Sequence, residues 1–270
     1  MRIRTSSFAT ILLLNSSFAY ADDRCAGYVG KIVKPETFKD LASTLDNTAP
    51  KGEFETTVDY QKRLASAQSG GPRIISKEFE DPKFFEYDAD GARLRIKAYA
   101  FNTGYMDFWS AFYDNKSDIK ASVGDNIATV ISQKDAPGGT FDAQNGYGAH
   151  FTVTRINRVT EAVFDRKAEV ITKPNIGYEQ IIPSDANGYV GQILMSPTEA
   201  QKLKPKIRIV FIVQPRVPFL VQGKHQVGKV TTQNPVEVTE SFSILIVNIQ
   251  CGMLIDDNNR VLASYDAARP

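Results

Sequence analysis

The chain holds only two histidines, His150 and His225, among its 270 residues. Sites that use several histidines, such as many zinc centres, therefore have few candidates. The motifs H-E-x-x-H, C-x-x-C and G-x-S-x-G and a phosphate-binding loop are absent from the sequence. His150 follows a Gly-rich segment and is predicted to be a strand-end histidine, and His225 is predicted to be an exposed loop residue. We expect a non-catalytic protein without a cofactor or a metal; the alternative is an exported hydrolase with a site around His150 and nearby acids.

One acidic segment resembles the first half of a calcium-binding loop. Glu86, Asp88 and Asp90 occupy positions 1, 3 and 5, and Gly91 stands at the turn position. Position 12 requires a bidentate glutamate in such loops, but it is Lys97 here. The segment is therefore predicted to be a hairpin turn rather than a calcium site.

The first 21 residues are typical of a signal peptide. Arg2 and Arg4 supply a basic start, residues 8–14 are largely apolar, and the segment 19–21 reads Ala-Tyr-Ala, with small residues at the two positions that a signal peptidase recognises. The apolar run is shorter than the roughly 20 residues that span a bilayer, and no transmembrane anchor is expected later in the chain. We therefore predict an exported protein, periplasmic or secreted, whose mature part is residues 22–270.

Two cysteines remain after this cleavage, Cys25 near the new N-terminus and Cys251 near the C-terminus. In an oxidising compartment two lone cysteines often pair. Closing so long a loop stabilises the folded state by up to about 5 kcal/mol in the chain-entropy view. The sequence therefore predicts a Cys25–Cys251 disulfide; the alternative is two separate thiols, with Cys251 buried as a small apolar side chain.

The segment between Glu199 and Glu237 contains no acidic residue. Such a basic stretch is suited to contact an anionic envelope component or an acidic protein surface, and its alternative is an ordinary solvated face. Nucleic acid is not expected as a partner, because the chain is exported and its net charge is only +1. The candidate surface consists of Lys202, Lys204, Lys206, Arg208, Arg216, Lys224 and Lys229.

Seven aromatic residues gather between Tyr99 and Tyr113. Several of them, including Phe108 and Phe112, have helical spacing, so we expect them to pack in a core. The alternative is an exposed platform on which sugar rings or peptides stack.

Periodicity predicts the elements that must position these residues. Apolar spacing predicts helices over 38–45 and 53–64, and turn residues predict hairpins over 84–101 and 149–164. Ser196 and Glu199 form a capping-box pattern that opens a short helix. Strands are expected at 207–213, 235–250 and 252–265. The predicted fold class is α+β, with two N-terminal helices, a mostly antiparallel sheet and one short capped helix, in a single domain with a weak subdivision near 175–190 as the alternative.

Two stretches of the chain resemble segments of uncharacterised secreted or periplasmic bacterial proteins. One has the pattern E-F-E-T-T-x-x-Y-x-x-R and covers 53–63, and the other is a Q-N-x-x-G turn at 144–148. The resemblance implies export and a shared architecture, and it implies no activity.

Overall fold

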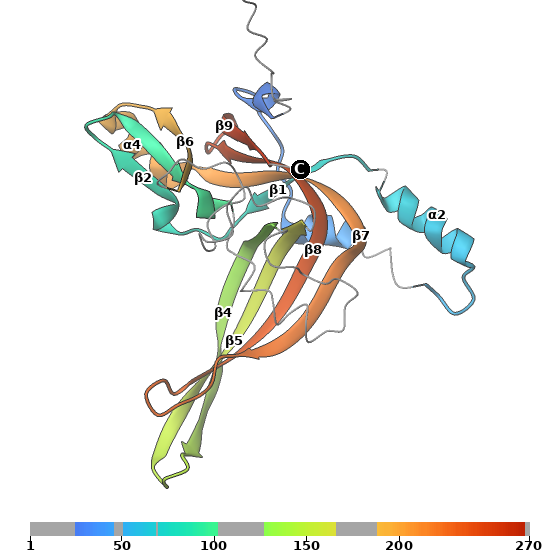
Figure 1. Ribbon diagram of the computed structural model, residues 1–270, viewed down its shortest axis with the longest axis vertical. Helices are drawn as coiled ribbons and strands as arrows, with labels where there is room; N and C mark the ends of the chain where they lie inside the picture. The colour runs from blue at the N-terminus through green and yellow to red at the C-terminus, as the bar shows by residue number, and fades with distance from the viewer. Residues whose placement is uncertain (1–24, 46–50, 69, 102–126, 166–187, 268–270) are drawn as a thin grey trace, which may run out of the picture.

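The computed structural model describes residues 25–45, 51–68, 70–101, 127–165 and 188–267. This part of the chain is mostly β-structure. Four long strands dominate it, namely β4 (Ile127–Gln144), β5 (His150–Asp165), β7 (Arg208–Val227) and β8 (Val236–Ile255). Figure 1 shows these strands side by side, with the β4–β5 hairpin extending well beyond the rest of the molecule.

The four long strands belong to one curled sheet, which also contains β1 (Arg73–Lys77) and β9 (Val261–Asp266). The strand order is β1-β7-β8-β5-β4, and β9 pairs with the C-terminal part of β8. Just after β1, the backbone N–H groups of Glu78 and Phe79 donate to the carbonyl oxygen of Ile131 in β4 at 2.7 Å each. Because β1 and β4 stand at opposite ends of the strand order, these bonds show that the sheet curls until its edges meet.

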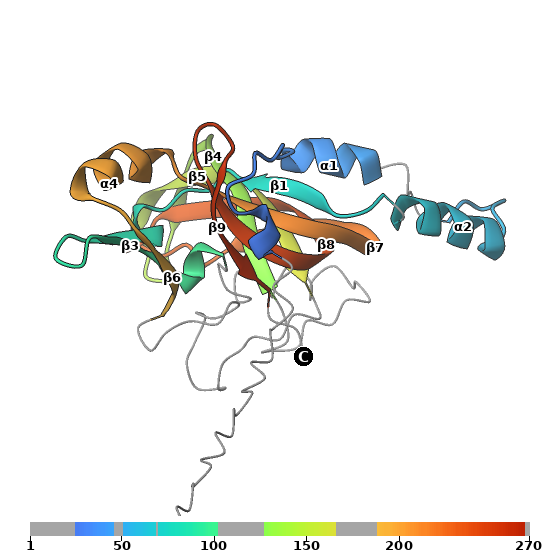
Figure 2. The same ribbon diagram turned by 90° about the horizontal axis from the view of Figure 1, so that it is seen from above.

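The predicted α+β fold class is wrong. The described chain is mostly β, and its main sheet is mixed, because β5 and β8 run parallel while their other neighbours are antiparallel. The N-terminal region contains α1 (Phe38–Leu45) and α2 (Thr57–Gln68). Figure 2 shows α1 next to β1, where Phe38, Leu41 and Leu45 are buried, and α2 projecting beyond the sheet. The periodicity of apolar residues predicts the amphipathic helices, but it does not show that far more residues lie in the long strands than in the helices.

A second, three-stranded sheet has the order β2-β3-β6 and is antiparallel. It consists of β2 (Phe85–Asp88), β3 (Arg93–Lys97) and β6 (Tyr189–Leu194), and the β2–β3 pairing confirms the predicted hairpin around 88–91. After β6 comes α4 (Pro197–Leu203), where the predicted capping box is confirmed. The Ser196 side chain accepts from the Glu199 N–H, and the Glu199 carboxylate accepts from the Ser196 N–H at 2.8 Å.

The predicted hairpin over 149–164 is wrong, because β5 runs without a turn through Asn157 and Arg158. These polar residues occupy an exposed part of the strand, where Arg158 forms an ion pair with Asp135 of β4 at 2.8 Å. The real turn lies at 145–149 and joins β4 to β5. The Asn145 side chain accepts from the N–H groups of Tyr147 and Ala149 at 3.0 Å each, which explains why an asparagine and glycines lie together there.

The largest apolar cluster packs β7 and β8 against α1, β3 and the segment around Phe101. Gly252 of β8 allows this packing, because a Cβ atom there would collide with the ring of Phe101. Phe101 in turn packs edge-on against Phe211, with ring centroids 5.9 Å apart. Side chains from distant parts of the sequence therefore meet on one face of the curled sheet.

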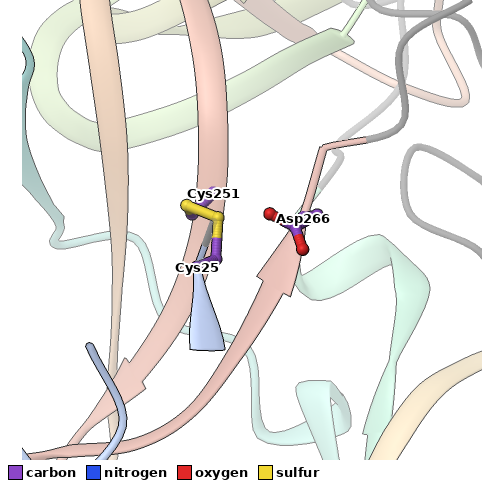
Figure 3. A group of neighbouring side chains, drawn as sticks. All are labelled: Cys25, Cys251 and Asp266. Atoms are coloured by element: carbon purple, nitrogen blue, oxygen red, sulfur yellow. A yellow bond between two sulfur atoms is a disulfide. The ribbon is translucent and has the colours of Figure 1, made fainter. Parts of the chain in front are cut away.

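The predicted disulfide between Cys25 and Cys251 is confirmed, with the two Cα atoms 6.0 Å apart. It joins the short 3₁₀ turn η1 (Ala26–Tyr28) to β8, and both cysteines are buried. Figure 3 shows Asp266, the last residue of β9, beside the bond. The bond closes a loop with a sequence separation of 226, for which the chain-entropy view gives about 5 kcal/mol.

Three predictions fall wholly or mostly on residues that the structure does not describe: the signal peptide at 1–21, the subdivision near 175–190, of which 175–187 are not described, and the aromatic segment beyond Phe101. They stay predictions. Within the described ranges, no helix is both long and apolar enough to cross a membrane.

Candidate ligand-binding pocket beside Lys77

A lysine occupies a core position at the end of β1. Ile75 and Lys77 alternate onto the inner face of the strand, and they are 0% and 3% exposed. In the register of the sheet, Lys77 stands opposite Ile209 of β7. The first residues of β7 and the last residue of β1 therefore form one wall of the site.

The Lys77 amine has two oxygen partners among the described residues. Its Nζ atom donates to the carbonyl oxygen of Ala100, in the 3₁₀ turn η4 (Ala98–Ala100), at 2.7 Å and lies 3.2 Å from Oγ1 of Thr129 in β4. Within the described ranges, no carboxylate forms an ion pair with it. Three segments far apart in the sequence thus converge on a single nitrogen atom.

Two aromatic rings also lie near this amine. The Nζ atom lies 4.6 Å from the ring centroid of Phe84 and 5.8 Å from that of Phe79. Phe84 belongs to the 3₁₀ turn η3 (Pro82–Phe84), which begins where the Asp81 side chain accepts from the Lys83 N–H at 2.8 Å. This cap fixes the turn and so holds the Phe84 ring against the amine.

Burial lowers the pKa of Lys77 to about 7. Desolvation disfavours the ammonium form, and the nearby negative charge of Asp81 opposes this effect only in part. The faces of Phe79 and Phe84 also attract a cation, but they do not replace the water that a free ammonium group binds. A substantial fraction of Lys77 is therefore an uncharged amine near neutral pH.

A pocket of about 340 Å³ includes Lys77 in its lining. Its volume lies at the lower end of the range for small-molecule sites. Charged residues also border it: Lys77, Glu80 and Asp81 on the β1 side, and Lys204 and Arg208 on the β7 side. The apolar lining consists of Phe79, Pro82, Phe84, Phe85, Pro205, Ile207 and Ile209.

The opposite charges around the pocket limit which ligands it suits. Two acids, Glu80 and Asp81, balance Lys204 and Arg208, and the Arg208 guanidinium already donates to Asn259 Oδ1 at 2.6 Å. The electrostatics therefore do not select a strongly charged ligand of either sign. A mostly apolar molecule with a small neutral polar group is the better match.

The hydroxyl of Tyr99 is a second polar group next to the Phe84 ring. The two ring centroids are 5.3 Å apart, and the Tyr99 Oη atom is buried without a hydrogen-bond partner among the described residues. Burial, together with the negative charge of Asp81, raises the pKa of Tyr99 to about 12. Tyr99 thus keeps its proton at neutral pH, and its hydroxyl group, next to the Phe84 ring, donates no hydrogen bond to a described residue.

Sequence reasoning missed Lys77. Of the predicted basic surface, the structure places Lys204 and Arg208 in the lining of this pocket. The only local signal is a lysine that alternates with Ile75 in a short strand. Its burial depends on Phe84, Ala100 and Thr129, which no local pattern places beside it.

The predicted basic surface is spread along the molecule. Lys202 lies on α4, Lys204 and Lys206 lie in the 3₁₀ turn η6 (Lys204–Lys206), and the others follow along β7 and beyond its end. Lys206 forms an ion pair with Asp257 at 2.7 Å, and Arg216 donates to Asn248 Oδ1 at 2.8 Å. An acid and an amide that are distant in sequence thus bind two of these basic side chains. The structure brings together the first residues of the set, up to Arg208, and separates them from Arg216, Lys224 and Lys229.

The two histidines lie near the ends of long strands, His150 at the start of β5 and His225 near the end of β7. His150 is exposed at the start of β5, opposite Gln144, and has no carboxylate partner among the described residues. The predicted loop position of His225 is wrong, because it lies within β7. Its Nε2 atom is 3.3 Å from a carboxylate oxygen of Glu240, and the same carboxylate accepts from the Thr160 hydroxyl. Glu240 links β7 to β5 in this way.

The segment that resembles a calcium loop uses its carboxylates within the β2–β3 hairpin. Asp88 accepts from the Gly91 N–H at 2.9 Å and pairs with Arg93 and Arg95 at 2.8 Å each. These bonds, the Gly91 N–H foremost, lower the pKa of Asp88 to about 2. Glu86 forms an ion pair with Lys97 at 3.1 Å. Acidic residues with the spacing of a calcium loop thus stabilise the β2–β3 hairpin and its turn.

One group of three side chains has the composition of a metal site. The ligand atoms of Cys25, Cys251 and Asp266 all lie within 4.8 Å of one another. Metal binding by cysteine requires thiolates, and here the two sulfur atoms are joined (Figure 3). In this oxidised form the group is a structural bond beside a carboxylate.

The residues that carry the resemblance to secreted or periplasmic proteins serve local structure. Glu55 forms an ion pair with Arg63 at 2.7 Å, and Asn145 accepts hydrogen bonds within the β4–β5 turn. Comparison of the chain with protein-family models, with curated proteins and with solved structures found no match.

Proposed function

We propose that the protein is an exported, non-catalytic binding protein that takes a small, mostly apolar molecule into the pocket beside Lys77. One observation carries this proposal: a pocket of about 340 Å³ is lined mainly by apolar side chains, yet its lining includes the buried Lys77, which forms no ion pair with any described residue. Apolar walls with a few convergent polar groups are the usual composition of a small-molecule site.

Octanol, octanoate and octylammonium have the same chain and differ only in charge, so they test the match between ligand and pocket. Isothermal titration calorimetry is expected to show saturable binding of octanol with a stoichiometry of one, and weaker binding of both ions, because the charges around the pocket balance. Absence of saturable binding for all three compounds would overturn the proposal.

Two Phe→Ala variants connect such binding to the pocket. Phe79 lines the pocket, whereas Phe54 is 94% exposed and lies just before α2. Phe79→Ala is expected to weaken octanol binding at least tenfold, because it removes an aromatic wall. Phe54→Ala makes the same chemical change outside the pocket and is expected to leave the affinity unchanged. Equal effects of the two variants would show that octanol binds elsewhere.

Export belongs to the same proposal. A buried disulfide is typical of proteins that fold in an oxidising compartment, periplasmic or extracellular. Intact-mass measurement of the protein recovered from such a compartment is expected to give a chain that starts at Asp22. A mass that includes Met1 would contradict removal of residues 1–21. Contact of the basic residues with an anionic envelope component or an acidic protein surface stays a prediction of the sequence.

A further inference from the structure

We infer that the Lys77 amine is a carbonyl-reactive site, which forms an imine with an apolar aldehyde bound in the adjacent pocket. This inference rests on the proposed ligand pocket and names the class of ligand that it takes. In this inference Lys77 reacts with the ligand, in addition to its hydrogen bonding and packing in the core.

The hydrogen bonds of Lys77 suit an uncharged amine. A neutral amine has two N–H groups, and two oxygen atoms, those of Ala100 and Thr129, lie within reach of them. An ammonium group has a third N–H, for which the described residues offer ring faces but no further oxygen atom. The neutral form therefore satisfies both oxygen atoms and keeps its nitrogen lone pair, which is the group that attacks a carbonyl carbon.

The surroundings also hold the amine in its reactive protonation state. A lysine whose ammonium form is destabilised by burial is the usual amine nucleophile toward carbonyl compounds. With a pKa of about 7, about half of Lys77 is neutral at pH 7. An exposed lysine with an ordinary pKa of about 10.4 is neutral to only about 0.04% at that pH, a difference of about a thousandfold.

The step needs no co-reactant. The lone pair of the Lys77 nitrogen attacks the aldehyde carbon, and the electrons of the C=O double bond move to oxygen, which takes up a proton. The carbinolamine then loses this oxygen as water, while the nitrogen gives up its two hydrogens and forms a C=N bond. One aldehyde and one amine thus yield one imine and one water. The neutral imine has no N–H; a proton that it takes up from solvent restores one N–H, which can donate to the Ala100 carbonyl oxygen.

The aldehyde itself fits the pocket. Its apolar chain matches the rings of Phe79 and Phe85 and the side chain of Ile209, and its carbonyl group carries no net charge. The balanced charges of the lining therefore neither attract nor repel it strongly. An aldehyde thus meets the same requirement as octanol and differs from it only in the reactive group.

Octanal with cyanoborohydride tests the inference on the wild-type protein. The reductant converts an imine into a stable secondary amine, which peptide mass spectrometry locates. At pH 7 we expect at least tenfold more adduct on Lys77 than on the average exposed lysine, and excess octanol should suppress the adduct on Lys77 alone. Labelling of Lys77 should rise with a midpoint near pH 7, whereas an amine with the ordinary lysine pKa of about 10.4 should still gain reactivity up to pH 10.

The possible outcomes separate this inference from the proposed function. Octanol binding without an adduct on Lys77 would overturn the inference and leave the binding function intact. An adduct on Lys77 that octanol does not suppress would overturn delivery of the aldehyde by the pocket. Equal labelling of Lys77 and exposed lysines would also overturn the inference that Lys77 is a carbonyl-reactive site. Lys77→Met should abolish the specific adduct, and Lys39→Met should leave it unchanged; because the pH profile uses wild-type protein, the test does not depend on folding of either variant.

Discussion

Replacement of Lys77 by methionine should change how the stability of the protein depends on pH. In the folded protein the pKa of Lys77 is about 7, and in the unfolded chain it is about 10.4. Below pH 7 both states carry the ammonium, so the folded protein bears the full cost of burying the charge. As the pH rises from 7 to about 10.4, the unfolded state binds more protons than the folded state, and the free energy of unfolding increases.

The size of the effect follows from these two pKa values. Between pH 7.5 and pH 9.5 this group alone raises the free energy of unfolding of the wild-type protein by about 2.5 kcal/mol. Lys77→Met lacks the titrating group and should not show this increase. All other titrating groups are common to both proteins, so the difference between the two proteins isolates Lys77.

Urea unfolding at the two pH values, followed by circular dichroism with the disulfide intact, measures this difference. The free energy of unfolding of the wild-type protein minus that of Lys77→Met should increase by about 2.5 kcal/mol from pH 7.5 to pH 9.5. The control variant Lys39→Met makes the same substitution at an exposed position on α1. If the curves of wild type and Lys77→Met run parallel, Lys77 is not a buried, uncharged amine and the reasoning about the site fails.

Three further predictions concern the framework of the fold. Reduction of the Cys25–Cys251 bond should lower the free energy of unfolding by up to about 5 kcal/mol, and an unchanged urea midpoint in the reduced protein would contradict this. Ser196→Ala removes the cap of α4 and should cost about 1 kcal/mol; stability equal to wild type in urea would rule out that contribution. Gly252→Ala places a methyl group against the ring of Phe101 and should cost about 1–3 kcal/mol, so a thermal midpoint at or above the wild-type value would refute the packing described.

The parts of the structure that were predictable from sequence are local or have few alternatives. The capping box at Ser196 depends on residues three positions apart, and its side chains can recognise each other without the rest of the fold. The disulfide was predictable because the chain has one pair of cysteines, Cys25 and Cys251. The hairpin at 88–91 followed from a short turn between two alternating segments.

The wrong or missing predictions depend on contacts between distant segments. Asn157 and Arg158 look like a turn because they are polar, but the exposed ribbon formed with β4 allows polar residues within a strand. The parallel pairing of β5 with β8 has no local signature, and it decides that the sheet is mixed. In the sequence, Lys77 does not differ from other lysines at strand ends; its burial depends on contacts with the distant residues Phe84 and Thr129.

A crystal structure of the protein with octanol would test the central claim most directly. We predict octanol with its chain between Phe79 and Ile209 and its hydroxyl group toward the Lys77 amine. Octanol density at another site, with the pocket beside Lys77 containing only water, would contradict the assignment of this pocket as the ligand-binding site.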